Sequence, residues 1–255
     1  MIALIVLNLF FSLNAFVCSK ATVDERKNDP LPDSRPEKFA ILYGLSGGMM
    51  YYSESMYLSS DSCTYEVNDG GVKSKIYFNL SAADLDGLYK IFKDNKFDRI
   101  KTYEQEVFDR GGESIYLSWA DGKYASVFNG GMTFINDNWQ TEWSNCLGSL
   151  MNVLHAQLDK QKKDYEVRID RSFFGKTMNI YIRNETIIPE STIMAESELE
   201  HYVTKTIKLM PGAHRVSVSW DKKHYETIPI NTDSSKGINL SLVNDSLKTT
   251  LINNY

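Results

Sequence analysis

The sequence predicts an α+β domain followed by an all-β sandwich, and three observations indicate this order. Over residues 39–158, strand-like segments surround two long segments whose apolar residues recur at the helical spacing of three and four. After residue 164, apolar residues recur at every second position in short segments separated by turn residues. A charged linker begins at Lys160 and separates the two patterns. We therefore expect an α+β domain at 38–159 and a β-sandwich at 164–255.

The leader, residues 1–18, is almost entirely apolar and has the length of the hydrophobic region of a secretory signal. A membrane-spanning helix needs about 20 apolar residues, so a permanent span is the weaker interpretation. No Lys or Arg precedes the apolar run, which leaves an uncleaved signal anchor open. The leader predicts an extracytoplasmic protein that is secreted, periplasmic or an outer-membrane lipoprotein.

Cys18 follows the apolar run directly and is a lipidation candidate. In bacterial lipoproteins the signal ends before a cysteine that is acylated and becomes the first mature residue. Ala15 and Val17 fit the residues expected before such a cysteine poorly. Cleavage after Ala21 competes with lipidation, because Ser19 and Ala21 supply small residues at the two required positions. Both fates stay open.

Residues 19–37 contain half of the six prolines and many charged residues. Such a segment buries too little apolar surface to fold and is typical of a flexible linker. We therefore expect a disordered tether between the leader and the first strand.

The first domain is expected to contain a hairpin followed by a well-specified helix. The Asn-Asp-Gly-Gly sequence at 68–71 is typical of a hairpin turn. Ser81 and Asp84 form a short capping box before an apolar stripe, which predicts a helix that ends near Asn95. A second helix is predicted at 137–158. The predicted strands of this domain are 39–43, 49–58, 63–67, 73–79, 114–119 and 124–128. This order favours an antiparallel sheet with both helices on one face.

The second domain is expected to contain seven short strands and little helix, which is typical of a β-sandwich. A longer connection at 184–203 is expected to hold a short helix near 196–202. The predicted strands are 165–170, 178–183, 206–209, 215–220, 225–230, 238–243 and 247–252.

Composition excludes some partners. Hydrophobic residues make up 42% of the chain, which is enough to build cores, and the net charge is −5. The chain has no basic stripe, so no nucleic-acid partner is expected. It also has no basic amphipathic helix, so membrane contact is expected only through a lipid anchor or an uncleaved leader.

Cys63 and Cys146 remain as a pair if Cys18 is lipidated or removed. In an oxidising compartment they can form a disulfide, and two buried free thiols are the other interpretation. A catalytic cysteine needs a nearby base. His155 lies about 13 Å along the predicted helix from Cys146, which is too far for a hydrogen bond.

Two surface features are candidate ligand sites. Asp109 and Arg110 precede two glycines and form either a ligand-facing loop or an ordinary turn. Tyr51, Tyr52 and Tyr57 form either a carbohydrate platform or cross-strand packing. No nucleophile elbow, zinc-binding helix or phosphate-binding loop occurs, so no catalytic, cofactor or metal residue is assigned.

Two segments resemble known families. The run from Leu209 to Val216, with Tyr225 in the next strand, resembles the start of a strand in the PEGA-type β-sandwich. This resemblance implies a non-catalytic extracytoplasmic module near a bacterial surface. Residues 80–97 and 109–112 resemble small uncharacterised domains of secreted proteins from Bacteroidetes-like bacteria, which implies the same location.

The sequence therefore predicts an exported bacterial cell-envelope protein that binds an envelope protein or a surface glycan without catalysis. A hydrolase acting on envelope polymer or carbohydrate stays open as an alternative, because carboxylates distant in sequence can meet in the fold. A carbohydrate-binding protein is the third interpretation. No cofactor is expected.

Overall fold

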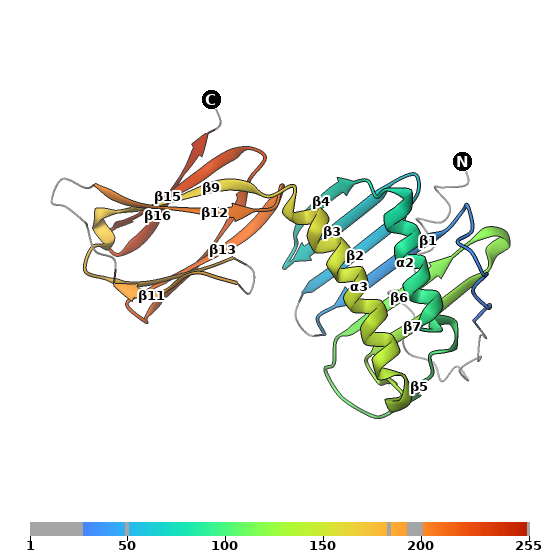
Figure 1. The fold of residues 1–255 in the computed structure, drawn as a ribbon. Helices are drawn as coiled ribbons and strands as arrows, with labels where there is room; N and C mark the ends of the chain where they lie inside the picture. Colours follow the sequence, from blue (N-terminus) through green and yellow to red (C-terminus); the bar gives the residue numbers. More distant parts are fainter. Residues whose placement is uncertain (1–27, 49–50, 183–184, 193–200, 254–255) are drawn as a thin grey trace.

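The computed structural model describes residues 28–48, 51–182, 185–192 and 201–253. The leader, Cys18 and the first part of the expected tether lie outside these residues. In the described part, the chain forms three β-sheets and two α-helices (Figure 1). This is a mostly β protein with several antiparallel strand pairs, consistent with the predicted fold class.

The first half of the described chain forms an eight-stranded sheet with the strand order β4-β3-β2-β1-β6-β7-β8-β5. Neighbouring strands are antiparallel throughout this sheet. The strands are β1 (Ala40–Ser46), β2 (Tyr52–Ser59), β3 (Cys63–Asp69), β4 (Val72–Phe78), β5 (Thr102–Glu104), β6 (Gly112–Ser118), β7 (Tyr124–Gly130) and β8 (Thr133–Ile135). The three-residue strands β5 and β8 are too short to show an alternating pattern, and the sequence did not predict them.

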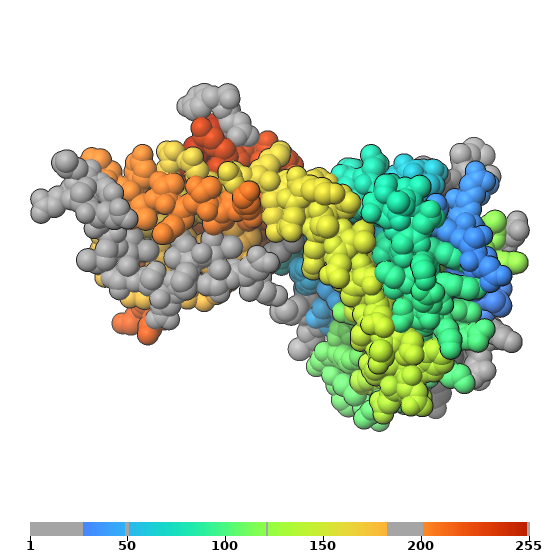
Figure 2. Space-filling view, viewed as in Figure 1, coloured from blue at the N-terminus to red at the C-terminus, as the bar shows by residue number. Residues whose placement is uncertain are grey.

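Two helices, α2 (Ala82–Asp94) and α3 (Gln140–Asp159), lie side by side on one face of this sheet (Figures 1 and 2). The predicted capping box is confirmed, because the Ser81 hydroxyl accepts from the Asp84 N–H and the Asp84 carboxylate accepts from the Ser81 N–H. A 3-10 turn, η4 (Asp137–Trp139), leads into α3. The stripes that the helices bury are Leu85, Leu88, Tyr89 and Phe92 in α2, and Trp143, Cys146, Leu150, Leu154 and Leu158 in α3.

The sheet is covered on one side only in the described part of the chain. Alternate residues of each strand point to opposite faces. On the helix side these residues are buried: Ile41, Tyr43, Met56, Leu58, Tyr65, Ile76, Ile115, Leu117 and Val127. On the other side, which we call the open face, most residues are half-buried or exposed.

The second half of the described chain forms two four-stranded sheets around one hydrophobic cluster, as in a sandwich. The strand orders are β11-β10-β13-β14 and β12-β9-β15-β16. The β9–β15 pair is parallel, and the other pairs are antiparallel. The strands are β9 (Lys163–Asp170), β10 (Thr177–Ile182), β11 (Glu185–Thr192), β12 (Tyr202–Leu209), β13 (Ala213–Trp220), β14 (His224–Asn231), β15 (Ser235–Val243) and β16 (Ser246–Asn253).

The predicted connection at 184–203 was wrong, because all of β11 and the start of β12 fall inside it. Pro189 argues against a strand in sequence terms, but β11 is at the edge of its sheet, where proline is tolerated. The predicted helix at 196–202 falls on residues outside the described part, except for its last two, and Tyr202 begins β12.

Residues 28–37 are packed against the sheet and α2, which differs from the disordered tether expected over 19–37; residues 19–27 lie outside the described part. The Asp29 N–H donates to the Tyr124 carbonyl at 2.9 Å, and Leu31 is only 3% exposed. Further contacts are the Tyr89 hydroxyl with the Pro32 carbonyl, the Lys93 ammonium with the Leu31 carbonyl, and the Arg35–Asp86 ion pair. Leu31 is a single buried apolar residue, and one residue produces no periodic pattern. The composition of the segment therefore indicated disorder.

The chain segment around Gly212 joins the sandwich to the eight-stranded sheet. Met210 is buried in the hydrophobic cluster of the sheet and helices. A Cβ on Gly212 would lie 3.1 Å from the Ser74 Cβ in β4, and Gly212 has a φ of +100° that favours glycine. Arg215 Nη1 lies 3.7 Å from an Asp69 carboxylate oxygen. This contact lies beside the edge strand β4, whose unpaired backbone groups would otherwise invite pairing with another chain.

The β6–β7 pair depends on two facing glycines. A Cβ on Gly130 would lie 2.1 Å from the Gly112 Cα, which is backbone and has no flexible side chain to move aside. Gly130→Ala is expected to destabilise the chain by about 1–3 kcal/mol through overpacking, measured as a lower urea midpoint. Gly87→Ala in α2 is the control, because its Cβ would meet nothing within 4 Å. That variant should gain up to ~1 kcal/mol of helix stability; equal midpoints for the two variants would contradict this packing.

Candidate functional site

Two strands of the eight-stranded sheet carry nearly the same sequence. Residues 54–59 of β2 are Glu-Ser-Met-Tyr-Leu-Ser, and residues 113–118 of β6 are Glu-Ser-Ile-Tyr-Leu-Ser. β1 lies between these strands and pairs with both in the same register, so Leu42 faces Tyr57 on one side and Tyr116 on the other. The two copies therefore place equivalent side chains on the same face. This repeat is the sequence signal that pattern analysis missed.

The register produces a line of side chains across the open face, which we call the tyrosine row. Its members, in strand order from β4 to β7, are Tyr77, Thr64, Tyr57, Leu42, Tyr116 and Ser126. Tyrosine occupies every second strand of the first five. Because neighbouring strands lie ~4.8 Å apart, successive tyrosines are separated by about 10 Å.

The tyrosines of the row are accessible. Tyr77 is 67% exposed and Tyr57 is 37% exposed. Tyr116 is half-buried and stacks on Tyr124 of β7, with ring centroids 5.4 Å apart and planes 18° apart. The row therefore presents aromatic rings that are supported from below by the sheet and, at one end, from the side by a second ring.

The centre of the open face carries no charged side chain. In β1, β2, β6 and β7, the described residues on this face are Ala40, Leu42, Gly44, Ser46, Ser53, Ser55, Tyr57, Ser59, Gly112, Ser114, Tyr116, Ser118, Tyr124, Ser126, Phe128 and Gly130. Charge first appears on the neighbouring strands, where Lys75 Nζ lies 2.5 Å from a Glu66 carboxylate oxygen. The central surface therefore offers hydroxyls and rings rather than ions.

The structure separates the three tyrosines that the sequence grouped. Tyr51 lies in the β1–β2 turn and is 87% exposed. Tyr52 is on the helix side, where its hydroxyl donates to the Glu54 carboxylate. Only Tyr57 lies on the open face, so an aromatic platform there consists of Tyr57 with Tyr77 and Tyr116.

Two carboxylates lie on the helix side of the sheet, on the strands β2 and β6 that flank β1. Glu54 and Glu113 both pair with Leu45 of β1, so they occupy one row, two strands apart. Burial raises the pKa of Glu113, the nearby Arg110 guanidinium lowers it, and the negative charge of Glu54 raises it. A carboxyl that is partly desolvated beside a second carboxylate is a candidate acid or base.

Asp109 and Arg110 are the two residues predicted to form a ligand-facing loop. The Arg110 guanidinium is directed toward the sheet. It donates to the Thr133 carbonyl at 2.8 Å and to Asn129 Oδ1 at 2.5 Å, and it lies 3.9 Å from the ring centroid of Phe134. Asp109 is exposed and has a left-handed φ of 60°. These contacts are those of a turn that closes the end of the sheet. Ligand binding by this loop stays a prediction.

The glycines after Arg110 also serve backbone packing. A Cβ on Gly111 would lie 2.3 Å from the Ser46 carbonyl oxygen, and one on Gly112 would lie 2.7 Å from the Gly130 Cα. These close approaches explain why the loop contains two glycines in succession.

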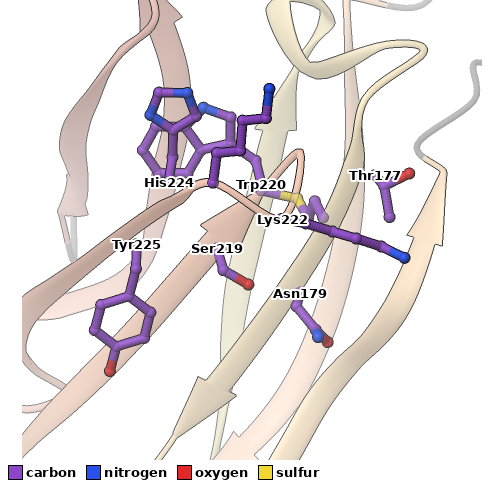
Figure 3. Close-up of a pocket in the computed structure, with 9 residues that line it drawn as sticks. Thr177, Asn179, Ser219, Trp220, Lys222, His224 and Tyr225 are labelled. Carbon is purple, nitrogen blue, oxygen red and sulfur yellow. The ribbon is translucent and has the colours of Figure 1, made fainter.

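A hollow of about 280 Å³ lies in the sandwich where β13 turns into β14 (Figure 3). Trp220, 2% exposed, forms its floor, and the His224 ring lies over the indole with centroids 5.0 Å apart. Trp220 Nε1 and Asn179 Oδ1 are buried and have no hydrogen-bond partner among the described residues. The lining consists of Thr177, Met178, Asn179, Ser219, Trp220, Lys222, Lys223, His224 and Tyr225, without a carboxylate.

The cysteines of the described chain are poor nucleophiles. Cys63 and Cys146 are buried free thiols in this structure, with no disulfide between them. Burial and the nearby Glu142 raise the pKa of Cys146 to about 12. A thiol with a raised pKa is mostly protonated and inert at neutral pH.

The described residues contain no group of three or more His, Cys, Asp or Glu side chains that could hold a metal ion. His214 pairs with Ile230 and His224 with Trp220, so the β13–β14 hairpin does not bring the two histidines together. Of the helices in the described part, none combines the length and the apolar character needed to cross a membrane.

No family model matches this chain, and neither a curated protein nor a solved structure matches it. The open face, the carboxylate pair and the hollow are the features of the described residues that bear on function.

The raised pKa of Glu113 predicts that the difference in stability between the wild type and Glu113→Gln depends on pH. The folded chain binds the Glu113 proton more tightly than the unfolded chain, so ionisation of Glu113 costs stability as pH rises through the folded-state pKa. Glu113→Gln stays neutral and should unfold at a higher temperature than the wild type at neutral pH. Below pH 4.5, the ordinary Glu value, the difference should vanish.

Thermal unfolding scans at the two pH values measure this difference. Glu104→Gln on the exposed strand β5 controls for the loss of one negative charge. A Glu113→Gln variant that is less stable than the wild type at neutral pH would contradict the prediction.

Proposed function

We propose that this chain is an exported bacterial cell-envelope protein that acts by binding, through the open face of its eight-stranded sheet, to an envelope protein or a surface glycan. The observation that carries the proposal is the one-sided sheet. Two helices cover one face, while the other presents the tyrosine row and a charge-free centre. A sheet face with exposed aromatic side chains that the described fold leaves uncovered is typical of an interaction site.

The proposal includes a division into two domains, 38–159 and 164–255, with residues 28–37 packed onto the first. Two separate hydrophobic clusters support this division, and Met210 belongs to the first cluster although it lies in the second domain. We further propose that the second domain is a PEGA-type module and that the first belongs with the secreted domains it resembles. Both resemblances favour a location near a bacterial surface.

A hydrolase is the second candidate function, and the Glu54–Glu113 pair favours it. Their backbones lie about 10 Å apart across β1, and glycosidases act through a pair of carboxyl groups that flank the scissile bond. The hollow at Trp220 contributes no acid to such a reaction, because no carboxylate lines it. Hydrolysis of envelope polymer by the wild type, lost in Glu113→Gln, would replace the binding proposal with this one.

Export is tested by intact-mass analysis of the protein recovered from its native host. An acylated Cys18 at the mature amino end is expected for a surface lipoprotein, and an amino-terminal Thr22 is expected for a secreted protein. An uncleaved chain in the membrane fraction would indicate an anchor. A full-length chain recovered from the cytoplasm would overturn the export proposal.

Binding through the open face is tested with the mature protein and isolated envelope fragments. Tyr57→Lys places a charge at the centre of the tyrosine row and should lower the sedimented fraction about tenfold. Tyr51→Lys makes the same change at an exposed tyrosine in a turn and should leave the fraction unchanged. Equal sedimentation of both variants, or no sedimentation of the wild type, would overturn the role of the open face.

A further inference from the structure

We infer that the occupant of the open face is an extended, uncharged polysaccharide whose sugar rings stack on the tyrosine row; this inference rests on the proposed function. The partner is thereby defined by three properties. It is a glycan rather than a protein, it is neutral, and its sugar rings recur with the spacing of the tyrosines.

The first argument is the spacing of the strand positions that carry the tyrosines. Tyr77, Tyr57 and Tyr116 stand two strands apart, at intervals of about 10 Å. In a β-1,4-linked pyranose chain, successive rings are flipped, so the same ring face returns at every second sugar. Two sugars of such a chain have a comparable length. Each tyrosine of the row can therefore receive the same face of alternate sugars, with its apolar ring against the sugar C–H groups.

The second argument is the distribution of hydroxyls. Six serines that are not buried lie on the central strands of the open face: Ser46, Ser53, Ser55, Ser114, Ser118 and Ser126. A serine hydroxyl both donates and accepts, as sugar hydroxyls do. Cores of protein–protein interfaces are depleted in serine. This composition favours a glycan over a protein partner.

The third argument is a glycine beside the row. Gly44 lies in β1 between Ser55 of β2 and Ser114 of β6, and it lacks a side chain. A Cβ at this position would lie 3.1 Å from the Ser114 hydroxyl oxygen, so this hydroxyl lies close over the glycine. The position next to Tyr57 and Tyr116 therefore presents a hydroxyl rather than an aliphatic side chain to a sugar on the row.

The fourth argument is charge. The central strands β1, β2, β6 and β7 carry no ion on this face, so a charged polymer would gain no ion pair there. Charges begin at the β3–β4 end of the row, where Lys75 pairs with Glu66 and its Nζ lies 5.3 Å from the Tyr77 ring centroid. Lys73 lies on the same face of β4. Binding of a neutral chain should therefore be insensitive to salt, whereas ion pairing is weakened by salt.

The test measures retention of the mature protein on insoluble cellulose and chitin, which are neutral β-1,4-linked chains. Amylose, neutral but helical, and polygalacturonate, extended but anionic, are the controls for shape and charge. The wild type should bind at least one β-1,4-linked chain with an affinity that added salt does not change. Its affinity for amylose and for polygalacturonate should be lower by about tenfold or more.

Variants connect the binding to the row. Tyr57→Ser and Tyr116→Ser should each lower the affinity about tenfold, because each removes one stacking ring. Tyr51→Ser, a matched change in the exposed turn, should bind like the wild type. Urea midpoints equal to that of the wild type show that the row variants are folded. Retention that the row variants share with the wild type overturns the inference.

Three further outcomes show whether this inference fails alone or together with the proposed function. If the wild type sediments with envelope fragments through Tyr57 but binds no polysaccharide, the partner is an envelope protein and only the glycan inference fails. If the wild type binds mainly polygalacturonate and salt weakens that binding, the partner is a charged polysaccharide and the inference of a neutral chain fails. If Tyr57 matters to neither assay, both the inference and the proposed function fail.

Discussion

The pairing of β1 with both β2 and β6 is the constraint on which the rest of the first half depends. It fixes the register of the central strands, and register decides which residues face the helices. A slip of one residue would exchange every side chain between the two faces of a strand. Met56 and Ile115 would then leave the core, and Tyr57 and Tyr116 would enter it. The buried cluster and the tyrosine row are therefore two consequences of the same pairing.

Local sequence predicts much of this arrangement, because its signals are local. The Ser81–Asp84 capping box and the apolar stripe after it specify α2 within a few turns of chain. The alternation of Ile115 and Leu117 with polar residues specifies which face of β6 is buried. These features follow from periodicity, which a single segment displays by itself.

Other features depend on contacts between distant segments, and the sequence did not reveal them. The order of strands in the sheet places β6 beside β1 although the intervening chain contains β2 to β5. The tyrosine row exists only once that order is known, since Tyr77 and Tyr116 are far apart in sequence. Residues 28–37 and the edge strand β11 were missed for a related reason, because their stability comes from the neighbours against which they pack.

The central claim is that one face of the eight-stranded sheet is covered and the other is accessible. Nitration of tyrosine by tetranitromethane, mapped by peptide mass spectrometry on the native mature protein, tests it directly, because the reagent needs an accessible, ionisable phenol. Tyr57 and Tyr77 should be nitrated, whereas Tyr43 and Tyr65, buried on the helix side, should be protected. Burial also raises the pKa of Tyr43, which adds to its protection. Nitration of Tyr65 with protection of Tyr57 would contradict the register and the assignment of the open face.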